Sequence, residues 1–352
     1  MNDDFYFIIG LMSGTSLDGI DLVFVKFDKK NYKDFKILAA ETIAYSNAWK
    51  GKLQEAISFS KDDLLLLDIE YAVLLSEEIN VFIKKNNITY IDFIASHGHT
   101  ILHQPDKGIT LQIGYGKVIA ENTQQKVICD FRTQDVALGG QGAPLVPIGD
   151  ELLFSQYDFC VNLGGFANVS YQKKAQRIAF DICPVNIVLN HYVQKLGFPY
   201  DDKGQIAKSS KINEELLGKL NALDFYKKSA PKSLGLEWVQ EIIFPLIDAS
   251  EKNIPIILRT FIEHSAIQIG KIIHKNDAVL ITGGGVFNDF LINRIEFYAE
   301  QKIEIPSKGL INYKEALIFA FLGLLRSENQ VNCLESVTGA KKDHSSGVIF
   351  NK

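Results

Sequence analysis

Long apolar runs are missing from this chain of 352 residues. The apolar stretch that starts at Phe5 meets Gly10 after about five residues, far short of the ~20 that a membrane-spanning helix needs. Nor does a basic n-region precede it, since the chain starts Met1-Asn2-Asp3-Asp4. A signal peptide requires such a region. We therefore expect no targeting segment and no membrane partner, and a cytoplasmic location.

An excess of positive charge is also missing. The net charge is −5 and the sequence has no basic stripe, so we expect no nucleic-acid partner. Cysteines are few and scattered without metal-ligand spacing, which favours reduced thiols in the core of a cytoplasmic protein. They are Cys129, Cys160, Cys183 and Cys333. No Gly-x-x-x-x-Gly-Lys-Ser/Thr or Gly-x-Gly-x-x-Gly motif is present, which disfavours P-loop enzymes and Rossmann dehydrogenases.

The composition, 47% hydrophobic and 22% charged, is that of a soluble globular protein. Its length exceeds one ordinary core and predicts two lobes. Each lobe opens with three predicted strands and a glycine-rich first turn: 5–11, 20–27 and 35–43, then 159–163, 169–172 and 177–182. Alternating helices and strands follow each set. The pattern predicts a duplicated α/β fold, with lobes 1–133 and 134–352 and a helix over 144–154 that leaves the first lobe.

Two further elements of the first lobe bear on the site. Ser60 with Asp63 resembles a capping box for a helix over 64–85. A strand over 90–95 is predicted to open onto the polar segment Ser96-His97-Gly98-His99-Thr100.

The first glycine-rich turn, within Gly10 to Asp21, is the most informative segment. Its glycines let the backbone approach a bulky anion, its hydroxyls can donate to it, and Asp18 and Asp21 can hold a divalent metal. This combination indicates a nucleotide phosphate site; the alternative is an ordinary glycine-rich hairpin. Two more glycine-rich turns, 162–168 and 283–288, also follow apolar strands, and together the three favour one ligand held from several sides.

Other polar residues also suit a ligand site. Arg132 suits a carboxylate or phosphate, and Asp135 or Gln141 suits sugar hydroxyls, although a structural ion pair is equally compatible with each. Asp181, at the end of a strand, can deprotonate a hydroxyl or water, or can cap the helix near Asn186.

Three histidines, His97, His99 and His103, lie close together in the sequence. They permit a zinc site, but no carboxylate recurs at matching spacing, which favours a structural or substrate-binding role.

In sequence order, these residues resemble the anhydro-N-acetylmuramic acid kinase family, a branch of the sugar kinase, Hsp70 and actin superfamily. The matching stretches are Gly10 to Asp21, Ser96 to Thr100 with His103 and Pro105, Leu111 to Gly114, Asp130 to Arg132 with Asp135 to Ala137, Gly139 to Pro147, Asn162 to Gly165 with Ala167 and Asn168, Pro231 to Ser233, Thr282 to Gly285, Glu315 with Ala316, and Ser336 to Ala340. The resemblance implies a duplicated ribonuclease H-like (actin-like ATPase) fold, with two lobes around a central cleft.

The resemblance implies that ATP and Mg²⁺ are bound and that the protein is a homodimer. It implies hydrolytic opening of 1,6-anhydro-N-acetylmuramic acid and phosphorylation of O6, which gives N-acetylmuramic acid 6-phosphate and ADP in peptidoglycan recycling. Asp181 matches the general base and Glu315 a supporting acid. The remaining matches are Gly14, Thr15, Ser16, Asp18, Gly19 and Asp21 for phosphates and metal, Asn162, Gly164 and Gly165 for the second phosphate loop, Gly283, Gly284 and Gly285 for adenosine, and His97, Arg132, Asp135 and Gln141 for the sugar.

The chain departs from the family pattern after Asp181. The family's Asp-Thr-Gly-Pro-Gly-Asn is replaced by Asp181-Ile182-Cys183-Pro184-Val185-Asn186. If that turn requires positive φ, Cys183 and Val185 are poor substitutes for glycine. Two alternatives to the family reaction follow: a catalytically impaired pseudokinase that binds sugar or nucleotide, and a kinase for a different sugar.

Overall fold

The computed structural model describes residues 4–14 and 17–352, which form two compact units. Unit 1 contains the described residues up to Leu153 together with Tyr313–Lys352, and unit 2 contains Phe154–Asn312. This division differs from the expected boundary between residues 133 and 134. Residues 134–153 stay with unit 1 because they pack on its C-terminal part: a Cβ on Gly149 would lie 2.7 Å from Ile318.

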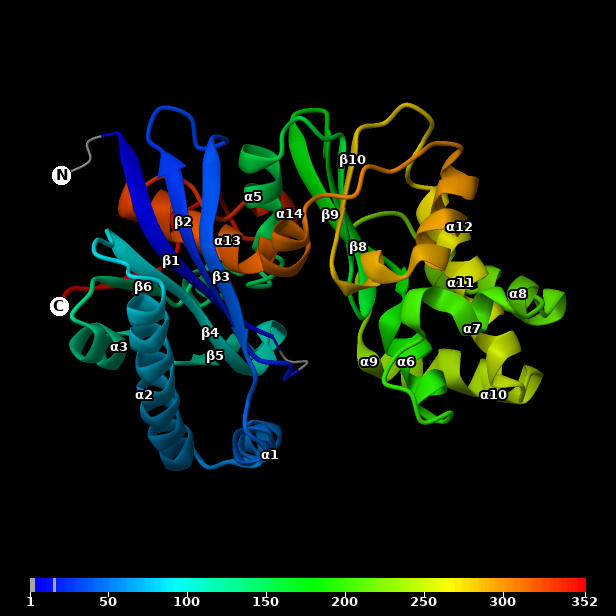
Figure 1. Cartoon of the computed structure of the whole chain (residues 1–352), viewed down its shortest axis with the longest axis horizontal. Coiled ribbons are helices and arrows are strands. Elements are labelled where there is room, and N and C mark those ends of the chain that lie inside the picture. Colours follow the sequence, from blue (N-terminus) through cyan, green and yellow to red (C-terminus); the bar gives the residue numbers. More distant parts are fainter. Residues whose placement is uncertain (1–3, 15–16) are drawn as a thin grey trace. The chain divides into compact units, whose positions relative to one another are not determined.

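Unit 1 is built around a seven-stranded sheet in the order β11-β6-β4-β1-β2-β3, with β5 paired to β4 (Figure 1). Its strands are β1 (Phe5–Ser13), β2 (Ile20–Asp28), β3 (Phe35–Ile43), β4 (Phe93–Gln104), β5 (Ile109–Ile113), β6 (Val127–Cys129) and β11 (Val348–Phe350). Its helices are α1 (Asn47–Glu55), α2 (Lys61–Lys85), α3 (Gly116–Thr123), α4 (Thr133–Ala137), α5 (Val146–Leu153), α14 (Glu335–Thr338) and most of α13 (Lys308–Ser327).

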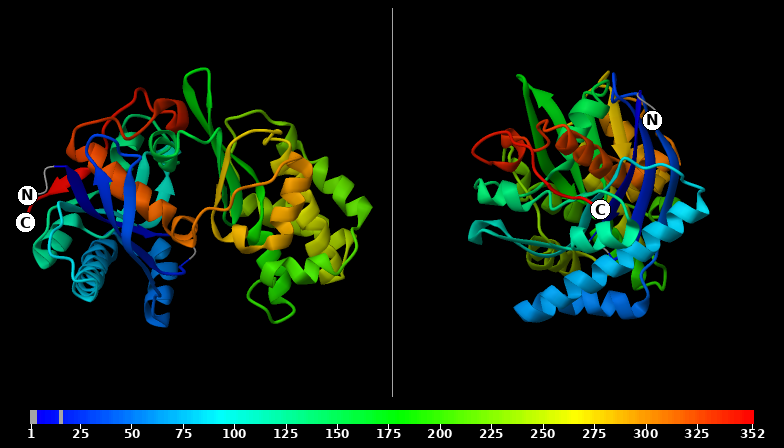
Figure 2. Two further views of the ribbon diagram at one scale, coloured as in Figure 1. Left: turned by 45° about the horizontal axis from the view of Figure 1, so that its top comes forward. Right: turned by 90° about the vertical axis from the view of Figure 1, so that its left-hand side faces the viewer.

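Helices cover both faces of this sheet (Figure 2). Successive residues of β1 point alternately to one face and the other. Ile9 and Leu11 point into a core shared with α2, whereas Gly10, between them, faces α13. A Cβ on Gly10 would lie 2.2 Å from the carbonyl oxygen of Ala316. Only glycine therefore lets α13 approach this strand so closely.

Strand β4 is longer than predicted. It runs from Phe93 to Gln104 and contains the whole Ser96–Thr100 segment. The register shifts between its pairings with Leu11 and Ser13, as Ser96 and His99 are their partners. Gly98 lies in this bulge with a φ of 71°. A bulge inserts an extra residue and redirects the neighbouring side chains.

Unit 2 contains a four-stranded sheet in the order β10-β7-β8-β9 (Figure 1). Its strands are β7 (Phe159–Leu163), β8 (Phe166–Lys173), β9 (Gln176–Pro184) and β10 (Val279–Thr282). Its helices are α6 (Asn186–Gln194), α7 (Gln205–Lys208), α8 (Glu214–Asn221), α9 (Leu236–Trp238), α10 (Phe244–Ser250), α11 (Ile254–Gly270) and α12 (Asp289–Ala299), with a 3₁₀ turn η6 (Gly284–Phe287). The core packs apolar residues of α11 and α12 against the sheet.

The two sheets share one topology. In each, three antiparallel strands follow one another, and a fourth strand pairs in parallel with the first: β1-β2-β3 with β4, and β7-β8-β9 with β10. In unit 1 the parallel strand β6 extends the set. This is the strand order of the ribonuclease H-like fold, so the predicted duplicated α/β class is confirmed.

Two smaller predictions are also confirmed. Ser60 caps α2 by accepting a hydrogen bond from the backbone N–H of Asp63, and all four cysteines are free and buried. Within the described ranges, no helix has both the length and the apolar character needed to cross a bilayer.

Candidate functional site

The β1–β2 turn carries the predicted phosphate and metal residues of unit 1. The backbone N–H of Leu17 donates to the carbonyl of Gly14 at 3.2 Å. Gly19 is required by packing, because a Cβ there would lie 2.4 Å from the carbonyl oxygen of Ile43. Thr15 and Ser16, predicted to contact phosphate, lie outside the described residues.

Negative charge gathers beside this turn. Asp18 is exposed, while Asp21 is half-buried and accepts a hydrogen bond from Thr42 at 2.6 Å. Burial raises the pKa of Asp21, the Thr42 hydrogen bond opposes the rise, and the charge of Asp18 adds to it. Glu315 is reached by water, yet desolvation by the surrounding protein raises its pKa, and the charge of Asp21 acts in the same direction. Three carboxyl groups thus share one region of unit 1.

Arg132 is held by His97. The guanidinium donates from Nε to His97 Nε2 at 3.0 Å and from Nη1 to the carbonyl of Gly142 at 3.1 Å. His97 Nδ1 lies 2.9 Å from the carbonyl of Gly98, so Nδ1 carries the proton and Nε2 accepts. Burial lowers the pKa of Arg132 to about 10, and the charge of Glu315 opposes that change. Arg132 therefore stays charged at neutral pH.

His99 takes part in a different network. It lies 2.9 Å from the hydroxyl of Ser13, which also contacts Tyr45 at 2.5 Å and Tyr71 at 3.0 Å. Burial lowers the pKa of His99 to about 4, so the ring is neutral. Ser13 is the last residue of β1, directly before the predicted phosphate turn. The hydrogen bonds of this network therefore hold the end of β1 in place. Sequence reasoning missed Ser13, Tyr45 and Tyr71, because nothing in the sequence shows that they meet.

The histidines do not converge on a metal. The bulge at Gly98 sends His97 against Phe319 of α13, with ring centroids 4.5 Å apart, and His99 against Tyr71 of α2 at 6.0 Å. These helices cover opposite faces of the sheet. Within the described residues, no potential metal-binding group includes His97, His99 or His103.

Asp135, in α4, and Gln141, in the loop that follows α4, differ in exposure. Asp135 is fully buried, and its carboxylate accepts from the backbone N–H of Gly142 at 2.6 Å and from the hydroxyl of Thr338 at 2.7 Å. Gln141 is exposed, and its backbone N–H donates to the carbonyl of Thr338 at 2.8 Å. Asp135 therefore anchors the loop, whereas the Gln141 side chain is available to a ligand.

Unit 2 brings the two remaining glycine-rich turns together. Gly283, with a φ of 87°, packs against the end of β7, where a Cβ would lie 2.5 Å from the amide oxygen of Asn162 and 2.8 Å from the carbonyl of Leu163. Gly284 has no such neighbour within 4 Å. The carbonyls of Gly164 and Gly165 accept hydrogen bonds from the backbone at the start of α6. The second phosphate loop and the triple glycine are thus adjacent.

Asp181 lies on β9. Its Oδ2 accepts from the backbone N–H of Leu234 at 2.8 Å, and its own N–H donates to the carbonyl of Lys232 at 3.1 Å. Within residues 4–14 and 17–352, Oδ1 has no hydrogen-bond partner. Burial raises the pKa of this carboxyl, and the Leu234 bond opposes the rise. Asp181 does not cap α6, because Val185 occupies that position. The Asp181 carboxylate is therefore accessible and more basic than an ordinary aspartate.

Comparison with known proteins decides between the families that such an arrangement permits. The sequence model described as "Anhydro-N-acetylmuramic acid kinase" matches residues 6–352. The anhydro-N-acetylmuramic acid kinase of Bacillus cereus (strain Q1) is 34% identical, covering 96% of this chain and 97% of its own length. That of Pseudomonas syringae pv. tomato is 32% identical, with 98% and 99% covered. This chain belongs to the anhydro-N-acetylmuramic acid kinase family.

Two solved structures show a more distant likeness. Component A of (R)-2-hydroxyglutaryl-CoA dehydratase from Acidaminococcus fermentans is 13% identical with a TM-score of 0.46, over 90% of this chain and 96% of that one. Gluconate kinase from Lactobacillus acidophilus is 12% identical with a TM-score of 0.43, over 97% and 93%.

As a member of the anhydro-N-acetylmuramic acid kinase family, the chain is a sugar kinase, a phosphotransferase with an alcohol group as acceptor. The residues that depart from the family pattern after Asp181 do not adopt the positive φ that would require glycine. No residue from Asp181 to Asn186 has a positive φ, and Ile182 to Pro184 continue β9. Cys183 and Val185 are both 0% exposed and belong to the unit 2 core. Glycine is therefore not required there.

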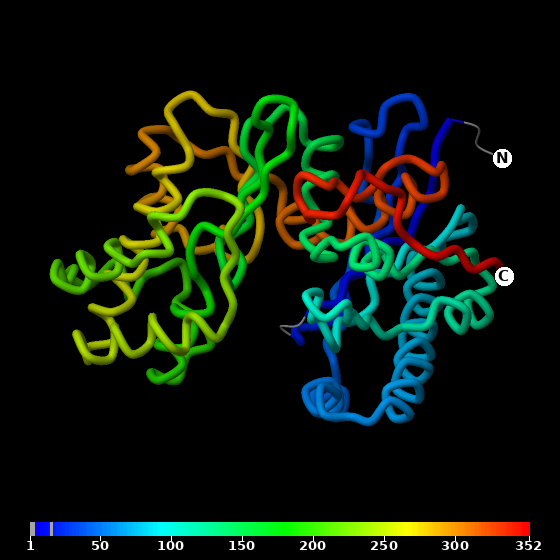
Figure 3. Tube along the Cα trace, turned by 180° about the vertical axis from the view of Figure 1, so that it is seen from behind, coloured from blue at the N-terminus to red at the C-terminus, as the bar shows by residue number. Residues whose placement is uncertain are grey.

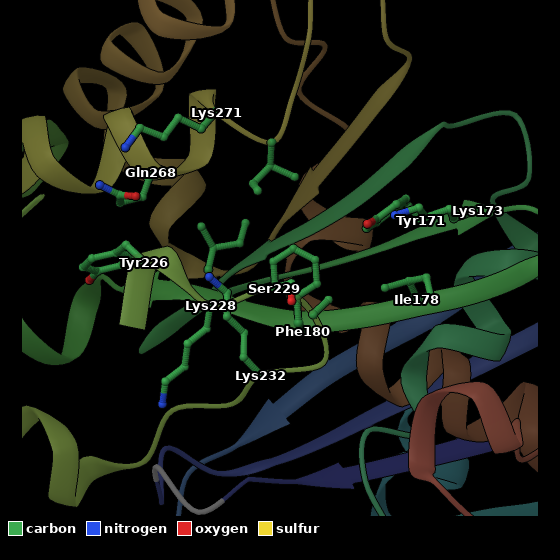
Figure 4. A pocket seen from close by; sticks show the side chains of 13 residues that line it. Tyr171, Lys173, Ile178, Phe180, Tyr226, Lys228, Ser229, Lys232, Gln268 and Lys271 are labelled. Carbon is green, nitrogen blue, oxygen red and sulfur yellow. The ribbon is translucent and has the colours of Figure 1, made fainter. Parts of the chain in front are cut away.

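A separate cavity of about 370 Å³ lies on the other side of β9 (Figure 4). Ile178, Phe180 and Ile182 line it, and side chains alternate along a strand, so Asp181 faces away from it. Four lysines also line it: Lys173, Lys228, Lys232 and Lys271. The cavity is thus distinct from the surroundings of the Asp181 carboxylate.

Proposed function

We propose that this kinase hydrolytically opens 1,6-anhydro-N-acetylmuramic acid and phosphorylates O6 with ATP, giving N-acetylmuramic acid 6-phosphate and ADP in peptidoglycan recycling. Family membership over residues 6–352 supports the substrate. The single structural observation that carries the proposal is the Asp181 carboxylate, which has one oxygen held by Leu234, the other open, and a pKa raised by burial.

Asp181 acts as the general base in this proposal. Oδ1 takes a proton from water, the water oxygen bonds to C1 of the sugar, and the C1–O6 bond breaks with its electron pair going to O6. O6 then forms the bond to the γ-phosphorus, and ADP leaves. A carboxylate made more basic by burial accepts the proton more readily than an exposed one, and the Leu234 N–H fixes its orientation.

The residues beside the β1–β2 turn fit a divalent cation. Asp21 and Glu315 each have a raised pKa to which a neighbouring carboxylate contributes, and a cation would relieve that repulsion. We assign Asp18 and Asp21 as Mg²⁺ ligands, directly or through water, and Glu315 as a supporting acid. Bound Mg²⁺ supplies neutralisation of the charge on phosphoryl oxygens.

The assignments for nucleotide and sugar follow the family resemblance. We assign Gly14, Gly19, Gly164 and Gly165 to the phosphates, and Gly284, where a Cβ would meet nothing within 4 Å, to the adenosine. Arg132, oriented by His97, and the exposed Gln141 are the sugar contacts. Asp135 supports the sugar site through the loop it anchors.

The test is ADP release and product analysis in H₂¹⁸O with Mg²⁺-ATP and 1,6-anhydro-N-acetylmuramic acid. We expect turnover with the heavy oxygen at C1, and a loss of about 10²–10⁴-fold in Asp181→Asn. The matched control is Asp224→Asn, since Asp224 is an exposed carboxyl of unit 2; it is expected to keep full activity.

Other outcomes point to the two alternatives. Ligand-induced thermal stabilisation without ADP would indicate a pseudokinase, and ADP release only with other sugars would indicate a different substrate. Resemblance to the family also leads us to propose a cytoplasmic homodimer, which light scattering after gel filtration checks for the oligomeric state.

A further inference from the structure

A second cluster of potential ligands is buried in unit 1, apart from the acidic turn. Asp135, Cys333 and His344 each place one ligand atom within 4.8 Å of the others. Their exposed fractions are 0%, 2% and 6%. Buried groups of this kind require partners, because transfer of an unpaired polar atom out of water is costly.

The backbone brings the three residues together. Cys333 and His344 exchange two backbone hydrogen bonds, at 3.1 and 3.2 Å, as an isolated antiparallel bridge. Side chains of such a directly opposed pair project to the same side. Thr338, between them in sequence, donates to Asp135 of α4 at 2.7 Å, and Figure 3 shows the C-terminal segment, in red, beside this part of the chain.

The imidazole of His344 leaves one nitrogen unsatisfied. Nδ1 lies 3.1 Å from the carbonyl of Lys342, which can only accept, so Nδ1 carries a proton. Nε2 has no hydrogen-bond partner, although it lies 3.5 Å from Oδ1 of Asp135. In the neutral ring, a lone pair then faces a carboxylate. Either a second proton or a metal cation must lie between them.

We propose that Asp135, Cys333 and His344 bind a divalent cation of the zinc class. Sulfur, nitrogen and oxygen form the ligand set that Zn²⁺ prefers. Ligands about 2 Å from a tetrahedral ion lie roughly 3.3 Å apart, which is close to the observed 3.5 Å between His344 and Asp135. A carboxylate and a thiolate balance the charge of the ion, and a water can fill the fourth position.

The proposed ion would act as a clamp. It would tie the C-terminal Cys333–His344 bridge to α4, which begins directly after Arg132. The exposed residues Gly139 and Gln141, in the loop held by Asp135, place the cluster close beneath the surface and offer an entry path. The site differs from the Mg²⁺ site because a thiolate ligand selects a softer metal.

Cobalt binding to the purified full-length chain tests this proposal. Co²⁺ is added after removal of metals, and the near-ultraviolet thiolate-to-cobalt charge-transfer band is measured. We expect about one Co²⁺ per chain to give this band, displacement by Zn²⁺, and a higher thermal midpoint with Zn²⁺. Co²⁺ in the acidic turn gives no such band, because that site has no sulfur.

Variants identify the ligands. Cys333→Ser is expected to abolish the band, and His344→Gln to weaken Co²⁺ binding at least about tenfold, whereas Cys129→Ser, which removes another buried thiol of unit 1, leaves the band unchanged. Absence of the band in the wild type overturns the proposal, and this outcome does not depend on whether any variant folds. An ion pair of protonated His344 with Asp135 would then explain the cluster. Persistence of the band in Cys333→Ser overturns it equally.

Discussion

The two sheets share a strand order but place their carboxylates on different strands. In unit 1, Asp21 near the start of β2 pairs with Thr42 of β3. In unit 2, Asn168 near the start of β8 pairs with Asp181 of β9. The acid therefore lies on the second strand in unit 1 and on the third strand in unit 2. The second strand of unit 2 carries the amide of Asn168 instead.

This difference separates two kinds of chemistry. Burial raises the pKa of Asp21 and the charge of Asp18 adds to that rise, while the charge of Asp21 in turn adds to the effect of burial on the pKa of Glu315. Burial alone raises the pKa of Asp181. Crowded carboxylates suit a cation, whereas an isolated one suits proton transfer. One strand arrangement thus carries the proposed metal site in one unit and the proposed base in the other.

The largest expected effect comes from removing the charge of Asp21, which lies among other carboxylates. Asp21→Asn should lower activity at least about tenfold and raise the Mg²⁺ concentration needed for half-maximal rate, because a ligand is lost. Asp34→Asn, an exposed carboxyl of the same unit, is the control. Steady-state rates across a Mg²⁺ titration measure both. An unchanged Mg²⁺ dependence would remove Asp21 from the metal site.

The second prediction compares two neighbouring glycines of unit 2, Gly283 and Gly284. Gly283→Ala should destabilise the fold by about 2 kcal/mol or more, since alanine pays for a positive φ and meets Asn162. Gly284→Ala should change stability by less than about 0.5 kcal/mol and weaken ATP binding. Urea unfolding and nucleotide titration distinguish them, and equal stability losses would show that the packing at Gly283 is unimportant.

The third prediction concerns the strand that carries Asp181. Cys183→Gly, which restores the family's glycine, should cost about 1–3 kcal/mol and give no gain in activity, because Cys183 fills the core of unit 2. Ala175→Gly is the matched control, as Ala175 is exposed with a φ of 62° and should tolerate glycine. A rise in turnover for Cys183→Gly would contradict the prediction.

The smallest effect is the pH dependence of stability at Asp181. A carboxyl whose pKa is raised in the folded state favours the protonated form, so its contribution is complete at acid pH and is lost as the pH rises through the folded pKa. Asp181→Asn should therefore be slightly more stable than the wild type at neutral pH and equal at acid pH. Thermal midpoints at both pH values measure this. A variant less stable at neutral pH would indicate that the carboxylate stabilises the fold.

The sequence by itself determined the class of the fold and supplied the residues of the proposed site. Apolar runs of strand length with glycine-rich turns predicted both three-stranded openings, and Ser60 with Asp63 predicted the start of α2, since these signals are local. Family motifs identified Asp181, Asp21 and the glycine turns. Apolar surroundings predicted buried, free cysteines.

Only the tertiary structure decided which residues meet. β4 runs past Ala95 because β5 pairs with its second half, and the Gly98 bulge sends His97 and His99 to opposite faces. Cys333 lies close to Asp135, about two hundred residues earlier, and pairs with His344 in an isolated bridge that has no local sequence signal. Cys183 and Val185 fit after Asp181 because both have a negative φ and lie in the unit 2 core, Cys183 within β9 and Val185 directly after it. Each of these outcomes depends on pairing and packing between segments distant in sequence, and propensities of single residues do not encode such contacts.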